Sequence, residues 1–237
     1  MKQFFVYFFL IFSVYLYSQE ILLHSHNDYL QAFPLKTALE YKANSIEVDV
    51  AWFGGEVKVS HFNFALKNKP DLETIYLKKM IEQKDELASV HFLMIDIKSG
   101  GEEILLKLNL LIGQYHEIFA SRNEIDVSKI KVIISGAVNR KKITENNSLN
   151  FLFADGNPKD LDNNINSNLM PLVSANYTSL TKVERLLLIE KAHKQGKKVR
   201  FWNTKDTFKS WKKLLELKVD FIGVDNLKKY YRFVSNR

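Results

Sequence analysis

The sequence predicts an α/β fold, a (β/α)8 TIM barrel, and two observations support this prediction. Short apolar, β-branched segments alternate with helical segments, which is the order of parallel βα units. Eight strand-like segments follow one another within about 200 residues, and eight is the number that closes such a barrel. A doubly wound open sheet is the alternative. No G-x-G-x-x-G motif follows a predicted strand, which disfavours the dinucleotide-binding version of that sheet.

The predicted strands are rich in Ile, Val, Leu and Phe and are bounded by polar or turn-forming residues. They cover residues 21–26, 45–53, 92–98, 131–135, 151–154, 171–175, 198–202 and 221–224. One segment does not fit a barrel strand. Gly54 and Gly55 form a turn signal after the second strand, so residues 56–61 are predicted to fold back as an antiparallel hairpin strand.

Helices are predicted between the strands, over residues 34–43, 101–120, 179–195 and 207–218. The first has Pro34 at a plausible first helical position. The second has an apolar stripe that includes Ile104, Leu108 and Leu111. The third ends at Gly196, a residue that suits the end of a helix.

The N-terminus has the pattern of a targeting segment. Lys2 precedes an apolar run over residues 4–17 that only Ser13 interrupts, and a polar stretch follows. The run is shorter than the about 20 residues of a transmembrane helix. We expect a signal peptide over 1–18, with an uncleaved anchor as the alternative. Residues 19–237 then form a single domain, exported to the periplasm or the cell exterior.

Composition excludes several kinds of site. The chain has 237 residues and no cysteine, so disulfides, cysteine–zinc sites and cysteine nucleophiles are absent. The net charge of +7 is compatible with nucleic acid, an anionic membrane surface or a phosphate-bearing substrate. Because the basic residues are spread along the chain without a nucleic-acid-binding motif, we expect no nucleic-acid partner.

The residues that could perform chemistry gather at predicted strand ends. Glu47 and Asp49 are two apart, so they point to the same side of an otherwise apolar strand, and a buried pair of carboxylates needs a cation or another partner. Carboxylate oxygens are the ligands that a hard divalent cation prefers. The other candidates from this pattern are ionisable residues on neighbouring strands: His24, His26, His61, Asp96 and Lys98. Acids for a cation, histidines for proton transfer and a lysine for an oxyanion suit displacement at phosphorus.

The hairpin sets a geometric condition on His61. A two-residue loop would place Ser60 opposite Asp49 and would turn His61 away from the carboxylates. We therefore expect a loop of odd length, or one bulge, that brings His61 level with Glu47.

Two segments resemble a known superfamily, the phosphatidylinositol-specific phospholipases C and glycerophosphodiester phosphodiesterases. His26-Asn27-Asp28-Tyr29-Leu30 resembles the opening catalytic box of the phospholipases, and residues 43–50 resemble the superfamily's metal-binding strand. Residues 92–100 resemble the next strand of the sphingomyelinase D branch. The overall pattern is most similar to the branch that includes altered inheritance of mitochondria protein 6. Residues 199–203 resemble a late strand with a site-lining Trp.

The resemblance implies a secreted, metal-dependent phosphoric diester hydrolase with the following roles. His26 and His61 are the acid–base pair, and Lys98 stabilises charge on the phosphate. Glu47, Asp49, Asp96 and Asn27 bind one divalent cation, Mg²⁺ or Ca²⁺. His24, Trp202 and Asn203 contact the substrate, a glycerophosphodiester or phospholipid-type molecule, and His24 either contacts it or supports the residues that do. We expect a monomer that makes peripheral contact with an anionic membrane.

Two other functions remain open at this stage. The His24-Ser25-His26 sequence also resembles the first strand of binuclear amidohydrolases and of the polymerase-and-histidinol-phosphatase type of phosphoesterase, although the chain has only six histidines. A secreted barrel that binds a ligand without turnover is the third hypothesis. Asp155, Asn157, Asn176 and the Arg140-Lys141-Lys142 cluster could each contact a substrate or serve only turns and solvent.

Overall fold

The eight predicted barrel strands form one closed sheet in the computed structural model, which describes residues 21–124 and 126–236. The strand order is β1-β9-β8-β7-β6-β5-β4-β2-β3, and β1 also pairs with β2, which closes the ring. The barrel strands pair in parallel, whereas β3 is antiparallel to β2. The predicted TIM barrel with a hairpin is therefore confirmed. The predicted signal peptide over 1–18 lies outside the described residues.

The strands follow the predicted segments closely. They are β1 (Leu22–Ser25), β2 (Ser45–Phe53), β3 (Glu56–Val59), β4 (Phe92–Ile97), β5 (Lys131–Gly136), β6 (Leu152–Gly156), β7 (Leu172–Asn176), β8 (Lys198–Trp202) and β9 (Phe221–Val224). The helices are α1 (Lys36–Glu40), α2 (Lys78–Glu82), α3 (Glu103–Gly113), α4 (Arg140–Thr144), α5 (Lys182–Lys194), α6 (Phe208–Leu217) and α7 (Leu227–Ser235).

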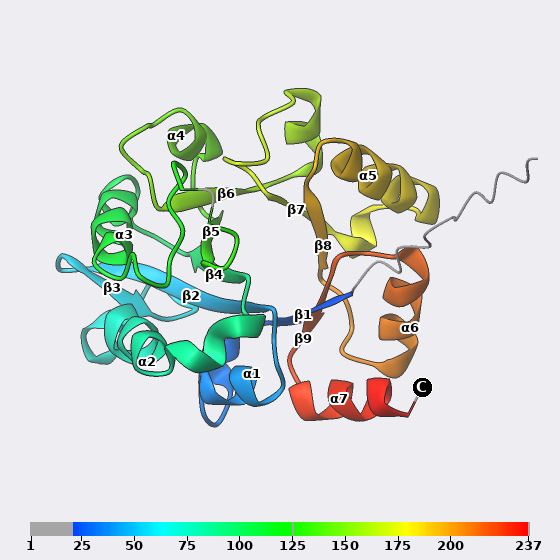
Figure 1. Ribbon diagram of the computed structural model, residues 1–237, viewed down its shortest axis with the longest axis horizontal. Helices are drawn as coiled ribbons and strands as arrows, with labels where there is room; N and C mark the ends of the chain where they lie inside the picture. The colour runs from blue at the N-terminus through cyan, green and yellow to red at the C-terminus, as the bar shows by residue number, and fades with distance from the viewer. Residues whose placement is uncertain (1–20, 125, 237) are drawn as a thin grey trace, which may run out of the picture.

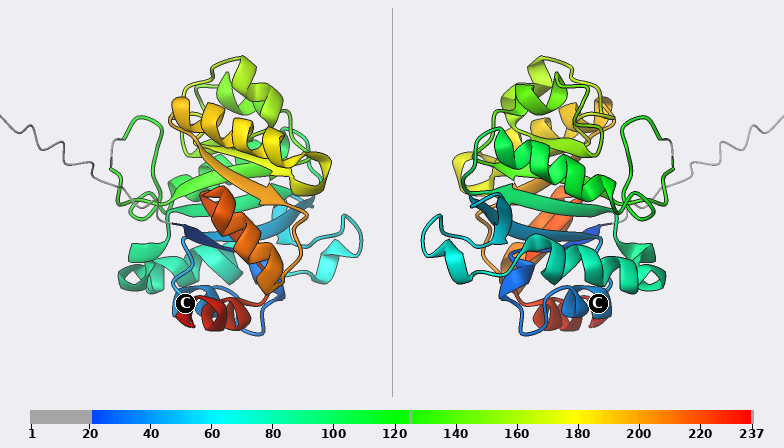
Figure 2. Two further views of the ribbon diagram at one scale, coloured as in Figure 1. Left: turned by 90° about the vertical axis from the view of Figure 1, so that its right-hand side faces the viewer. Right: turned by 90° about the vertical axis from the view of Figure 1, so that its left-hand side faces the viewer.

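The helices form an outer layer around the barrel (Figures 1 and 2). Among the described residues, no helix is both long enough and apolar enough to cross a membrane. The connection between β6 and β7 covers residues 157–171, and its helical part is the short 3₁₀ helix Pro158–Asp162. Asn157 caps this helix, and its Oδ1 accepts from Lys159 N.

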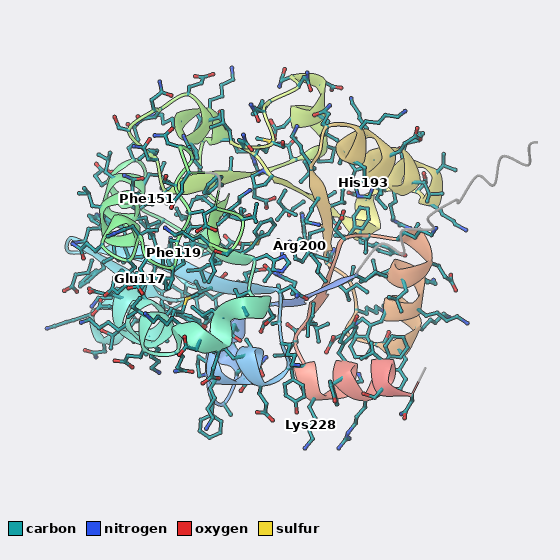
Figure 3. The ribbon with its side chains drawn as sticks, viewed as in Figure 1. Glu117, Phe119, Phe151, His193, Arg200 and Lys228 are labelled. Carbon is teal, nitrogen blue, oxygen red and sulfur yellow. The ribbon has the colours of Figure 1, made fainter. Side chains whose placement is uncertain are left out.

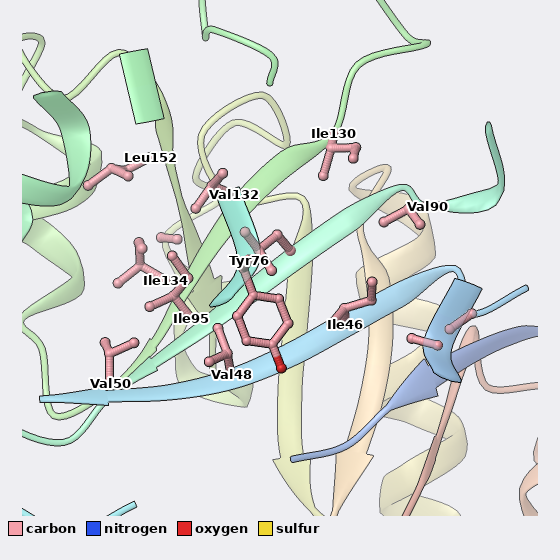
Figure 4. Packing of buried hydrophobic residues seen from close by; sticks show 14 of the residues in the cluster. Ile46, Val48, Val50, Tyr76, Val90, Ile95, Ile130, Val132, Ile134 and Leu152 are labelled. Atoms are coloured by element: carbon pink, nitrogen blue, oxygen red, sulfur yellow. The ribbon is translucent and has the colours of Figure 1, made fainter. Parts of the chain in front are cut away.

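The main core lies between the barrel and the helices. Ile46, Val48 and Val50 point outward from β2 and pack with Ile95 of β4 near the buried Tyr76 (Figure 4). A second, smaller apolar cluster fills the inside of the barrel and consists of Leu22, Phe92, Met94, Ala120, Ile133, Phe153, Leu172 and Phe221. Parallel barrel strands have both faces covered in this way.

The inside of the barrel changes from apolar to polar along five of its strands. Side chains two residues apart on a strand share a face. Five strands show the change directly, in the pairs Leu22 and His24, Met94 and Asp96, Ile133 and Ser135, Phe153 and Asp155, and Leu172 and Ser174. The polar side chains therefore gather at the carboxyl ends of the strands, where barrel enzymes place their active sites.

The expectation of an odd-length hairpin loop or a bulge is wrong. Phe53 pairs directly with Glu56 and Val50 with Val59, so the loop has two residues, both glycines with positive φ. Ser60 N donates to Asp49 O at 3.0 Å, which continues the same register. The regular strand ends at Val59, and the chain then bends over residues 61–65, so the position of His61 is not set by strand alternation.

Candidate active site

A pocket of about 650 Å³ opens among the carboxyl ends of the barrel strands. It brings together most of the residues that the sequence singled out. The predicted site residues that line it are His26, Asn27, Glu47, His61, Asp96, Lys98, Trp202 and Asn203. Asp49 is completely buried beside the pocket, within contact distance of several of these side chains.

Three carboxylates converge at one side of the pocket. Glu47 and Asp49 project from β2, and Asp49 lies directly opposite Asp96 of β4 in the parallel register. One oxygen from each carboxylate lies within 4.8 Å of the others. The two-residue spacing on β2 and the alignment of β2 with β4 are sufficient to produce this cluster.

Asp49 uses one oxygen for hydrogen bonds and leaves the other without a partner. Its Oδ2 accepts from Tyr29 OH at 2.9 Å and from His61 Nδ1 at 2.5 Å. The Lys98 ammonium lies 3.2 Å from this oxygen and 3.2 Å from Asp96 Oδ2. The Oδ1 atoms of Asp49 and Asp96 are both buried and have no hydrogen-bond partner among the described residues.

Glu47 is held by a buried cation that the sequence analysis did not assign to the site. Arg200 Nη1 lies 2.5 Å from Glu47 Oε2, and His24 Nε2 lies 2.6 Å from the same oxygen. Figure 3 shows Arg200 in the middle of the barrel. Burial acts to raise the pKa of Glu47, but Arg200 and His24 outweigh it and hold this pKa well below its usual range. Glu47 is therefore ionised.

The donor set fits a hard divalent cation. Asp49 Oδ1 and Asp96 Oδ1 lack partners, although an unpaired buried acceptor costs free energy. Burial raises the pKa of Asp96, and the neighbouring carboxylates of Asp49 and Glu47 add to this effect while Lys98 opposes it. A divalent cation would give the two Oδ1 atoms a partner and would favour the ionised form of Asp96, because carboxylate oxygens are the preferred ligands of Mg²⁺ and Ca²⁺. Glu47, Asp49 and Asp96 could hold such an ion.

His26 is oriented by an acidic residue from the last barrel strand. Its Nδ1 donates to Asp225 Oδ1 at 2.6 Å, and its Nε2 lies 3.9 Å from Glu47 Oε1. Burial acts to lower the pKa of His26, but the hydrogen bond to Asp225 and the charge of Glu47 outweigh it and raise this pKa. Because Nδ1 is engaged, Nε2 is the nitrogen left to exchange a proton in the pocket. The pairing joins residues 199 positions apart, so no local sequence pattern reveals it.

Hydrogen bonds to the buried Asp28 carboxylate hold the loop that contains His26 and Asn27. This buried carboxylate accepts from Ser25 Oγ at 2.8 Å, from Leu35 N at 2.7 Å and from Tyr76 OH at 2.9 Å. Asn27 adopts a left-handed backbone with φ of 49°. Its Oδ1 lies 3.4 Å from Tyr29 OH, in the pocket lining beside the carboxylates. The turn therefore places an amide oxygen and an imidazole at the same site.

Of the two roles expected for His24, the structure favours the supporting role over direct contact with the substrate. The side chain is completely buried inside the barrel, where its Nδ1 lies 2.8 Å from Ser45 Oγ. Burial and the charge of Arg200 lower its pKa to about 4, so the imidazole is neutral at pH 7. Its contacts with Glu47 and Arg200 give it a positioning role. The two histidines differ because His24 lies within β1, whereas His26 follows the end of that strand.

Trp202 and Asn203 lie on the pocket wall opposite the carboxylates. Trp202 is 45% exposed and ends β8. Asn203 has a φ of 57°, and its Nδ2 donates to Asn176 Oδ1 at 3.2 Å and to Thr178 Oγ1 at 3.0 Å. Both side chains are placed where a substrate could touch them.

A histidine-rich binuclear centre is not assembled here. Within residues 21–124 and 126–236, the one group of three or more potential His, Cys, Asp or Glu metal ligands consists of carboxylates alone. His91, His116 and His193 do not line the pocket. The structure thus gives no support to the amidohydrolase alternative.

A known protein family matches the N-terminal part of the chain. A model of the AIM6-like phosphodiesterase domain family matches residues 17–92, about a third of the chain. The match includes His26, Asn27, Glu47, Asp49 and His61, and it confirms the resemblance predicted from these motifs. A search of curated proteins found no match.

Solved structures share the fold. A Galdieria sulphuraria protein proposed to be a glycerophosphodiester phosphodiesterase has a TM-score of 0.67 and 17% identity, covering 92% of this chain and 98% of its own. The Ca²⁺-dependent phosphatidylinositol-specific phospholipase C of Streptomyces antibioticus has a TM-score of 0.64 and 12% identity, covering 88% and 94%. An Oleispira antarctica phosphodiesterase, solved with the product sn-glycerol-3-phosphate, has a TM-score of 0.55 and 12% identity, covering 90% and 96%. At these identities the likeness shows the fold.

Proposed function

We propose that this protein is a metal-dependent phosphoric diester hydrolase that acts on a glycerophosphodiester or phospholipid-type substrate by histidine acid–base catalysis. The observation that carries the proposal is the convergence of Glu47, Asp49 and Asp96 with two histidines and Lys98 in one pocket. This combination provides a cation site, two proton-transfer groups and a fixed positive charge around one position.

The residues divide the reaction between them. His26, oriented by Asp225, accepts the proton of the attacking hydroxyl at Nε2. His61, whose Nδ1 is held by Asp49, presents its other nitrogen to the leaving alkoxide and donates the proton that this oxygen needs. The Lys98 ammonium stabilises negative charge on a nonbridging phosphoryl oxygen. A divalent cation bound by the carboxylates would neutralise phosphoryl charge and acidify the nucleophile.

The two fixed cations have different tasks. Arg200 is engaged with Glu47 in the barrel and keeps this carboxylate ionised, whereas Lys98 lies at the pocket surface between Asp49 and Asp96. A cation held by Glu47, Asp49 and Asp96 would offset their negative charge, so that the Lys98 ammonium could contact an anionic diester.

The test uses a generic diester, bis-p-nitrophenyl phosphate, with metal-free protein and after addition of Mg²⁺ or Ca²⁺. We expect hydrolysis that chelator abolishes and that either cation restores. Full activity in chelator would exclude the metal mechanism. Clean cation binding without turnover on any diester would favour a ligand-binding barrel instead.

We also propose that the chain is exported after cleavage of residues 1–18 and that it acts as a monomer near anionic membranes. The apolar run after Lys2 supports export. N-terminal sequencing of protein recovered from the periplasm or medium tests the cleavage. A mature N-terminus at Met1 in the cytoplasm would contradict it.

A further inference from the structure

The pocket has a second polar wall, formed by strands other than β2 and β4, which bear the carboxylate cluster. It is formed by residues that follow β5, β6 and β7 and that no step of the proposed reaction uses. Arg140, Asn157 and Asn176 line it, each partly exposed to the pocket. Their hydrogen bonds determine which chemical groups this wall can offer to a ligand.

The amide oxygens of both asparagines are already occupied. Asn157 Oδ1 accepts from Lys159 N at 2.9 Å, where it caps the short helix after β6. Asn176 Oδ1 accepts from Thr178 N at 3.0 Å and from Asn203 Nδ2 at 3.2 Å. Neither Nδ2 group has a partner among the described residues, so each asparagine has only a donor left for a ligand.

Arg140 is fixed in a way that leaves the end of its guanidinium free. Its Nε donates to Asp155 O at 2.6 Å and lies 3.8 Å from Asp160 Oδ2. The two terminal nitrogens have no hydrogen-bond partner within the part of the chain that the structure describes. A guanidinium held by Nε presents these nitrogens as a preorganised fork, the geometry that suits phosphate or carboxylate oxygens.

We propose that this wall binds a second anionic group of the substrate, a phosphate or carboxylate carried by the alcohol part of the diester. Throughout this subsection, Arg140, Asn157 and Asn176 are called the anion wall. The substrate assignment rests on the proposed function, whereas the binding of an anion by the anion wall can be measured without turnover.

Charge and hydrogen bonding both favour this class of ligand. The anion wall offers a fixed positive charge and two amide donors, so a cationic headgroup such as choline finds no partner there. The nearest acids do not compete for the fork: Asp155 is buried, with Oδ2 engaged by Ser135 Oγ at 2.9 Å, and Asp160 accepts from Asn157 N at 2.8 Å. The pocket volume of about 650 Å³ leaves room for more than one phosphate.

The test measures binding of α,ω-alkanediol bisphosphates with three to six carbons and of the matching monophosphates, by calorimetry in the presence of Mg²⁺. We expect the best-fitting bisphosphate to bind about 10- to 100-fold more tightly than its monophosphate, the range for one charge-assisted bidentate contact. The ω-carboxyalkyl phosphates of the same lengths form a second arm, and tight binding only there would assign the wall to carboxylates.

Arg140→Gln should remove this gain, and Arg140→Lys should retain part of it because the charge remains while the fork is lost. Lys141→Gln is the matched control, because it removes the same charge from the neighbouring, exposed position. Equal affinities for bisphosphates and monophosphates in the wild type, or an equal loss in the Arg140→Gln and Lys141→Gln proteins, would overturn the proposal. Thermal unfolding of each variant shows whether it is folded.

The two proposals fail in different ways. If the bisphosphate gain is found but bis-p-nitrophenyl phosphate is not hydrolysed, the anion wall stands and the diesterase function is wrong. If that diester is hydrolysed and a second anionic group adds no affinity, the diesterase function stands and the anion wall is wrong.

Discussion

Asp155 gives a quantitative test of how burial sets the energetics of the barrel interior. The carboxyl group is 2% exposed, and Ser135 Oγ donates to its Oδ2 while Oδ1 has no partner. Burial raises the pKa of Asp155 from 3.8 to about 6, against the opposing influence of Arg200 and the nearby serine hydroxyls. The ionised form is therefore disfavoured in the folded protein.

The sign of the pH dependence follows from this shift. Below pH 4 the carboxyl is protonated in both the folded and the unfolded chain, so it has no effect. Between about pH 4 and pH 6 only the folded protein retains the proton, and the free energy of unfolding falls as the pH rises. Two pKa units correspond to about 3 kcal/mol, which is fully lost above pH 7.

Asp155→Asn removes the titration and keeps an oxygen for Ser135. The free energy of unfolding of this variant, relative to the wild type, should rise by about 2.5 kcal/mol between pH 4 and pH 7.5. Urea denaturation at several pH values measures it, and any constant packing cost cancels because it is the same at each pH. A difference between the two proteins that does not change with pH would refute the reasoning.

Three other substitutions test separate parts of the site. Gly136→Ala would place a Cβ 2.1 Å from Asp96 Oδ1, so we expect weaker cation binding and a loss of about 2 kcal/mol or more in unfolding free energy. Gly55→Ala, with the same φ of 87° and nothing within 4 Å, is the control for backbone strain, and equal effects would contradict a clash. Asp28→Asn should lower the unfolding free energy by about 1–3 kcal/mol, because the Asp28 carboxylate accepts three hydrogen bonds and the amide keeps only one acceptor oxygen. An unchanged urea midpoint would show that these hydrogen bonds do not stabilise the fold. Asp225→Asn should reduce diester hydrolysis about 10-fold or more while the urea midpoint stays unchanged, since this exposed side chain orients His26. Undiminished turnover would remove Asp225 from the mechanism.

The sequence could predict the barrel because its strands have a simple local signature. Apolar strands separated by helical segments define βα units, and the two-residue spacing of Glu47 and Asp49 places both carboxylates on one face. Their meeting with Asp96 follows from the pairing of β2 with β4. These features depend on neighbouring residues or neighbouring strands, so pattern analysis reaches them.

The contacts that the sequence did not reveal join strands that lie far apart in the sequence, either across the barrel or, for β9 and β1, side by side where the ring closes. Arg200 on β8 meets Glu47 on β2, and Asp225 after β9 meets His26 after β1. The sequence does not show which strands face or adjoin one another in the closed barrel. It therefore cannot show which residue pairs with a charged side chain on a given strand. His61 shows the opposite case: the expected register was wrong, but the bend after Val59 still places this imidazole on Asp49.

The central claim is that the carboxylate cluster holds a cation on which hydrolysis depends. Its most direct test titrates Mg²⁺ or Ca²⁺ into metal-free protein and measures binding heat and the rate of bis-p-nitrophenyl phosphate hydrolysis on the same preparation. We predict that both quantities reach half of their maximum at the same cation concentration and that Asp49→Ala abolishes both. A full rate in the absence of any divalent cation, or in the Asp49→Ala protein, would contradict the claim.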